Sequence, residues 1–193
     1  MSEEAEQRFT VSDDRLWHFD AGSLALDFAY TGGMGDSPAG ERLHTPADLA
    51  FWFTERFPEV DGTANDRDLT DALALRQAIA RSATAISRGD RPSADDVDIV
   101  NLFAATPDIP PSLEGGRRQA GRTRARASQV LSGMAREVTQ LFSADRADRI
   151  RECSAEDCQL VFYDESRSNN RRWCSMQRCG NRAKVRAHRA RLL

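Results

Sequence analysis

The spacing of apolar residues along the first two thirds of the chain predicts helices. Apolar residues recur at helical spacing over residues 66–88, the longest such stretch, which Gly89 ends. A second apolar stripe runs through residues 124–142, and Thr45 and Ser93 are typical first residues of two shorter helices. Because such stripes pack against one another, we expect a helical core.

The segments outside these helices carry tail, turn and extended patterns. Residues 1–14 are polar and are expected to form a flexible N-terminal tail. Residues 16–28 mix β-prone and small side chains, which predicts two short extended pieces joined by a turn at 20–23. Residues 107–121 are rich in Pro and Gly and predict an irregular connection. The fold prediction is mainly α, with a mostly helical domain over residues 15–145 that contains a small extended element.

Charge is distributed unevenly along the chain. The 193 residues carry a net charge of −3, yet residues 146–193 carry +6 and the residues before them −9. No acidic residue follows Glu165, and nine of the last 28 residues are Arg or Lys. A basic segment at the end of an acidic body indicates a surface for a polyanion, with a solvated basic tail as the alternative.

All four cysteines lie in this basic segment. They form two pairs, Cys153 with Cys158 and Cys174 with Cys179, each pair separated by four residues. Two close pairs joined by a longer loop suit tetrahedral zinc, because each pair supplies two thiolates. The chain begins with an acidic segment that lacks a signal-peptide core, so we expect a cytoplasmic protein with reduced cysteines. The spacing therefore predicts one structural Zn²⁺ held by these four side chains.

The residues around the cysteines predict a small treble-clef-like finger over residues 146–193. Residues 160–163 are β-prone and suit the first arm of a hairpin, and residues 171–173 would be the returning arm. Beyond Cys179, residues 183–192 predict a helix. So small a unit buries too little apolar surface to fold without its metal.

The predicted C-terminal helix places its cations in two adjacent rows. Arg182, Arg186 and Arg189 share one face, and nothing acidic lies on the helix to pair with them. Cations that meet phosphate release counterions, so the finger is a candidate nucleic-acid-binding surface. Its candidate contact residues are Arg167, Arg171, Arg172, Arg182, Lys184, Arg186, Arg189 and Arg191.

Enzyme classes with familiar sequence motifs are not indicated. The chain has no P-loop, GxGxxG, HExxH or GxSxG motif. Four thiolates would leave zinc no open position for water, which argues against catalytic zinc. No stretch approaches the ~20 apolar residues of a membrane helix. We therefore expect a protein that is not an enzyme and has no membrane partner.

Residues 153–191 resemble the CGNR zinc finger family, named for a tetrapeptide found here as Cys179-Gly180-Asn181-Arg182. Further matching residues are Arg151, Phe162, Asp164, Ser166, Arg167, Arg171, Arg172, Trp173, Ser175, Met176 and Lys184. In that family the finger follows a domain called ABATE, described as a stress-induced transcription regulator. Residues 24–28, with sequence LALDF, followed by Thr31, resemble the opening motif of that domain. The family usually has Asn directly before this Thr, where the present chain has Tyr30, and a ligand bound through that Asn would be affected.

The resemblance implies a DNA-binding transcription regulator of the stress response, associated with the nucleoid. Its finger would contact DNA, and its helical domain would sense a signal, such as a small-molecule effector, or form a homodimer. A single finger reads few bases, so site-specific binding would need that dimer. Two alternatives stay open: binding of RNA or the ribosome by the same surface, and a zinc-stabilised protein-interaction module that meets an acidic protein. Uncompensated cations favour nucleic acid over protein, and the scarcity of stacking aromatic residues favours DNA over RNA.

Overall fold

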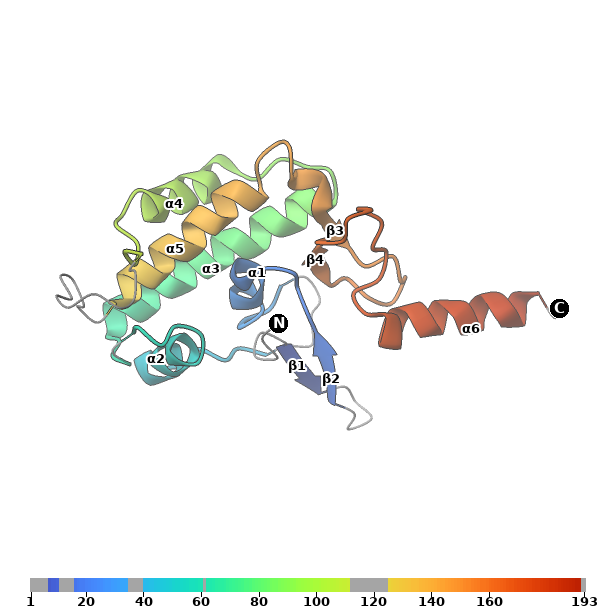
Figure 1. Ribbon diagram of the computed structural model, residues 1–193, viewed down its shortest axis with the longest axis horizontal. Helices are drawn as coiled ribbons and strands as arrows, with labels where there is room; N and C mark the ends of the chain where they lie inside the picture. Colours follow the sequence, from blue (N-terminus) through green and yellow to red (C-terminus); the bar gives the residue numbers. More distant parts are fainter. Residues whose placement is uncertain (1–6, 11–15, 35–39, 61, 112–124, 192–193) are drawn as a thin grey trace.

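A computed structural model describes residues 7–10, 16–34, 40–60, 62–111 and 125–191. Five helices form the larger part of the molecule, and a small finger lies at one end of it (Figure 1). The helices are α1 (Leu24–Ala29), α2 (Pro46–Thr54), α3 (Asp66–Ser87), α4 (Ala94–Ala104) and α5 (Ala127–Leu141). None of the helices in these ranges has the length and apolar character needed to cross a bilayer.

The long helix α3 lies at the centre and packs against the other helices (Figure 1). It begins at a capping box, in which Asn65 accepts from the backbone N–H of Asp68 and the Asp68 carboxylate accepts from Asn65 in return. It ends before Gly89, whose φ of 84° is readily adopted by glycine. The structure confirms the four predicted helices, which are α2, α3, α4 and α5, and their ends lie within a few residues of the prediction.

Of the two extended pieces predicted within residues 16–28, only the first is a strand. Strand β2 (Leu16–Phe19) pairs antiparallel with β1 (Gln7–Thr10), but the predicted second piece is helix α1. The Ser23 hydroxyl accepts from the N–H of Leu26, and the Glu137 carboxylate, 112 residues away on α5, accepts from the N–H of Ala25. A local pattern cannot reveal that second cap. Most of the predicted flexible tail, residues 1–14, and residues 112–121 of the predicted connection lie outside the described residues.

The finger contains strands β3 (Ile150–Glu152) and β4 (Val161–Tyr163), a wide π-helical turn η2 (Met176–Gly180) and helix α6 (Asn181–Ala190). The predicted first arm is confirmed as β4, but its antiparallel partner is β3 and not residues 171–173. The hairpin closes around the first cysteine pair, because the N–H of Cys153 donates to Leu160 O at 2.9 Å. The fold is mainly α with a treble-clef-like finger, as the sequence predicts.

The finger packs directly against the helical part of the molecule. The N–H of Tyr163 donates to Ala21 O at 2.8 Å, Arg171 donates to Asp20 O at 2.9 Å, and Arg88 forms an ion pair with Glu152. Helix α6 instead projects away from the body (Figure 1), and none of its ten residues is buried. The hairpin side of the finger is therefore anchored, while its last helix faces solvent.

Candidate metal centre and basic surface

The four cysteine side chains meet at the junction of the hairpin and helix α6. Cys153 and Cys158 lie in the turn between β3 and β4, and Cys179 lies in the turn η2 just before α6. All four sulfur atoms are buried and lie within 4.8 Å of one another. Zinc–sulfur bonds of about 2.3 Å place the corners of a tetrahedron about 3.8 Å apart. The Cys158–Cys174 and Cys174–Cys179 sulfurs, at 3.7 and 3.4 Å, fit that figure.

The four thiols are arranged to bind one zinc ion. All are free of disulfides, and the backbone N–H of Cys174 donates to the sulfur of Cys153 at 3.4 Å. Hydrogen bonds from Cys158 and Cys174 lower the pKa of the Cys153 thiol. The hydrogen bonds to Cys153 raise the pKa of both partners, since these share the remaining protons. A divalent cation would replace those protons. The prediction of one zinc ion is confirmed by the clustering of the four buried cysteines.

The tetrapeptide Cys179-Gly180-Asn181-Arg182 begins with the fourth ligand, and its next three residues have identifiable surroundings. A Cβ atom on Gly180 would lie 2.6 Å from the Met176 sulfur and 3.3 Å from the Trp173 ring, so the exposed Met176 side chain lies over the glycine and would have to move for a larger residue. The Asn181 side-chain amide donates to Gln177 O at 3.3 Å, which holds the first turn of α6 to η2. Arg182 donates to the Cys179 sulfur at 3.1 Å. Asn181 and Arg182 therefore join helix α6 to the turn η2 and to the last ligand.

The candidate nucleic-acid-binding residues fall into two groups in the structure. Six have exposed side chains, and two, Arg171 and Arg182, are half-buried and make several internal contacts. Arg171 donates to Asp20 O, Trp173 O and Cys174 O, and its guanidinium lies 4.2 Å from the Phe162 ring centroid. The six exposed residues are Arg167, Arg172, Lys184, Arg186, Arg189 and Arg191.

Asp157 is a site residue that the sequence reasoning missed. Its carboxylate accepts from Arg182 at 2.8 Å and from Arg186 at 3.2 Å, so two cations of the first basic row have an acidic partner. This acid lies in the first cysteine pair and not on the helix. In the sequence, its position directly before Cys158 places it near the metal site. Its contact with α6 depends on the fold, which brings that turn against the helix.

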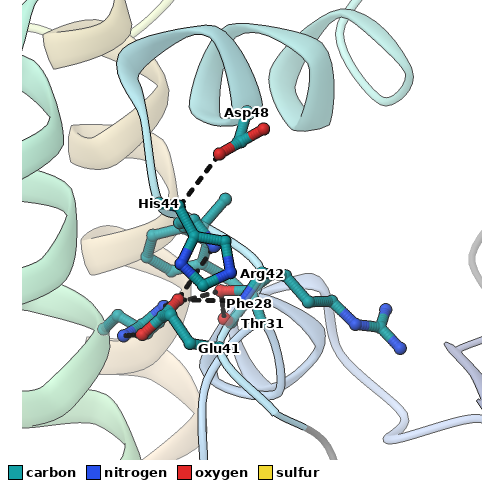
Figure 2. Close-up of polar contacts among 8 residues, drawn as sticks. Phe28, Thr31, Glu41, Arg42, His44 and Asp48 are labelled. Atoms are coloured by element: carbon teal, nitrogen blue, oxygen red, sulfur yellow. Dashed lines mark hydrogen bonds and ion pairs between the residues drawn. The ribbon is translucent and has the colours of Figure 1, made fainter.

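A second polar cluster surrounds Thr31, the last residue of the opening motif. Figure 2 shows Thr31 and Glu41 close together, with His44 and Asp48 farther along the chain. The Thr31 hydroxyl donates to Phe28 O at 2.7 Å, and its carbonyl accepts from the N–H of Arg42 at 2.8 Å. Thr31 therefore fixes the end of α1 to the segment that leads into α2.

The partner of Glu41 in this cluster is the buried Arg76 of α3. The two side chains form a bidentate ion pair with both distances at 2.6 Å, which is the main cause that lowers the pKa of Glu41 to about 2. A Cβ on Gly32 would meet this guanidinium at 2.7 Å. The pair borders a small polar pocket of about 340 Å³ on α3, whose arginines are already matched by carboxylates.

Two family models match consecutive parts of the chain. Residues 22–145 match the family model ABATE, described as "Putative stress-induced transcription regulator". Residues 149–192 match the model of the CGNR zinc finger. Both descriptions name regulatory or zinc-finger types and not enzymes. No curated protein matches the chain.

Proposed function

Since the chain belongs to the ABATE family of transcription regulators and ends in a CGNR zinc finger, we propose that it is a zinc-dependent DNA-binding regulator without enzymatic activity. The observation that carries the proposal is helix α6, which projects from the metal site (Figure 1) with three of its four cations, Lys184, Arg186 and Arg189, exposed. A link to stress follows from the family description alone.

Helix α6 has little to stabilise it in the free protein. Isolated helices shorter than about 12–15 residues are marginal in water, and α6 has ten residues with none buried. Lys184, Arg189 and Arg191 form no ion pair with any described residue, and like charges one turn apart repel. Phosphate groups would remove that repulsion and release counterions, so a polyanion is the partner that best fits this surface.

Among polyanions, duplex DNA suits the shape of this surface. The major groove of B-DNA admits one α-helix, and α6 has no buried residue and is exposed from Lys184 onward. Binding of single-stranded RNA relies on several stacking aromatic rings, and α6 carries one, the imidazole of His188. One finger contacts few base pairs, so we propose a homodimer formed through the helical part, which would also take any effector. Such a regulator acts in the cytoplasm, at the nucleoid.

Genome-wide footprinting of the tagged full chain in cells tests this proposal. We expect enrichment at discrete promoters, and loss of that enrichment in the variant Lys184→Gln/Arg189→Gln/Arg191→Gln. A control is Arg67→Gln/Arg91→Gln, which removes two exposed cations from the helical part. Crosslinking to RNA in place of promoters would favour the RNA alternative. Capture of neither nucleic acid would leave the protein-interaction module.

A further inference from the structure

The guanidinium of Arg182 joins the two halves of the metal site. Its Nη2 donates to the sulfur of Cys179, in the second cysteine pair, at 3.1 Å. Its Nη1 donates to the carboxylate of Asp157, which directly precedes Cys158 of the first pair, at 2.8 Å. Its Nε is buried and has no hydrogen-bond partner among the described residues. The half-buried side chain thus reaches toward the metal site, and the exposed Arg186 donates to the same carboxylate from the next turn of the helix.

The chemistry of the ligands favours a cation at this place. Four thiolates around Zn²⁺ leave a net charge of −2, and N–H groups that donate to the sulfurs stabilise that charge. A guanidinium is suited to the task because its planar fork supplies two parallel donors to two acceptors at once. Lysine would supply the charge from a single point, and glutamine would supply a donor without the charge.

We propose that Arg182 is a positioning residue of the metal centre and not a contact to phosphate. It holds the Cys179 thiolate against Asp157, and thereby closes the metal site and fixes the direction in which α6 leaves it. Helix α6 buries no residue of its own. Three side chains in its first half, Asn181, Arg182 and Arg186, make its described polar contacts to the rest of the finger. Of these three side chains, Arg182 is the one that also donates to a ligand sulfur, and it thereby couples metal occupancy to helix direction.

The test compares Arg182→Gln with Arg189→Gln in the zinc-loaded full chain. Arg189 is an exposed cation of the same helix face that lies outside the contact with Asp157, so it is the matched control. Transfer of zinc to a chromophoric chelator should be at least about tenfold faster in Arg182→Gln, the usual effect of losing such a supporting contact, and unchanged in Arg189→Gln. Arg182→Lys, which keeps the charge, should fall between Arg182→Gln and the unmodified protein.

A spectroscopic and a binding measurement separate positioning from general destabilisation. With Co²⁺ in place of zinc, Arg182→Gln should shift the sulfur-to-cobalt charge-transfer band, because the Cys179 sulfur loses an N–H donor. At saturating zinc, the salt dependence of binding to a 30-base-pair duplex should keep its slope in Arg182→Gln and lose up to about one unit in Arg189→Gln.

Two results would overturn the assignment of Arg182. Zinc transfer at the unmodified rate in Arg182→Gln would do so, whatever the binding result. A loss of salt slope equal to that of Arg189→Gln would identify Arg182 as a phosphate contact. If Arg182→Gln does not fold, Asp157→Asn keeps the arginine and removes one end of the bridge, and it should also transfer zinc faster. Absence of duplex binding in every protein would count against the proposed function, while the zinc and cobalt measurements would still decide the role of Arg182.

Discussion

The hydroxyl of Tyr30 forms hydrogen bonds with both backbone polar groups of Val161. It donates to the carbonyl oxygen at 2.9 Å and accepts from the N–H at 2.7 Å, and both residues are buried. Tyr30 follows α1 in the helical part, whereas Val161 begins β4 beside the metal site. Burial raises the pKa of this hydroxyl well above its ordinary value, so it stays protonated and able to donate. The residue at position 30, usually Asn in the family, therefore joins the helical part to the finger in this chain.

Replacement of Tyr30 by Phe should destabilise the whole protein. The N–H and C=O of Val161 would both lose their partner in a buried place, and each such loss costs about 1–3 kcal/mol. Urea denaturation should show a lower free energy of unfolding. Tyr163→Phe is the control, because its hydroxyl makes no hydrogen bond within the described part of the chain. Equal stability of the two variants would contradict the role of Tyr30.

The turn at Gly22 tests how closely the finger approaches the helical part. Its φ is 78°, and a Cβ would lie 2.3 Å from the carbonyl oxygen of Tyr163. Gly22→Ala should therefore lower the melting temperature by several degrees or more. Gly133→Ala, in the middle of α5 with nothing within 4 Å of the new atom, should raise stability by about 0.5–1 kcal/mol. A neutral Gly22→Ala would mean that the two parts are not in contact there.

The buried Asp27 of α1 should make stability depend on pH. Burial is the main cause that raises its pKa to about 8 from an ordinary 3.8, and the nearby Asp20 adds to this. Because the folded protein holds the proton more tightly than the unfolded chain does, the free energy of unfolding falls as pH rises from about 4 to about 8. Each unit of this shift is worth about 1.4 kcal/mol.

As pH rises from 5 to 8, the free energy of unfolding should therefore fall less in Asp27→Asn than in the unmodified protein. Urea denaturation at several pH values gives the comparison, with Asp98→Asn, an exposed residue of α4, as the control. Parallel pH profiles for Asp27→Asn and the unmodified protein would show that the carboxyl group is already ionised in the folded state.

Removal of zinc should weaken the helical part as well as the finger. Elemental analysis of untagged protein should find about one zinc per chain. A strong chelator should lower the melting temperature of the entire molecule, since binding of a structural zinc is folding free energy and the finger is bonded to α1 through Tyr30. Far-ultraviolet circular dichroism, to which helices α1 to α5 of the helical part contribute most, follows the effect. An unchanged transition after metal removal would show that the two parts unfold independently.

Features with local causes could be predicted from the sequence. Helices α2, α3 and α4 begin at Thr45, Asn65 and Ser93, whose side chains cap the helix start directly. The four zinc ligands follow from spacing alone, because each close pair lies in one tight turn. Local hydrogen bonds and short spacings are visible in a single sequence.

Features with long-range causes could not be predicted. Helix α1 depends on a carboxylate 112 residues away, and β4 pairs with β3 because the hairpin encloses the first cysteine pair. The ion pair of Arg76 with Glu41 spans 35 residues, and Asp157 meets Arg182 only when the metal site closes. Each depends on the packed fold, which charge counts and periodicity do not describe.

The proposed DNA binding is tested most directly by the salt dependence with which the zinc-loaded full chain binds duplex DNA. A variant with Lys184, Arg186, Arg189 and Arg191 replaced by Gln removes four exposed cations of α6 and its end. If these residues meet phosphates, the slope of log affinity against log salt should become shallower by about three to four units, with zinc content unchanged. An unchanged slope in that variant, or no binding by the unmodified protein at low salt, would contradict the proposal.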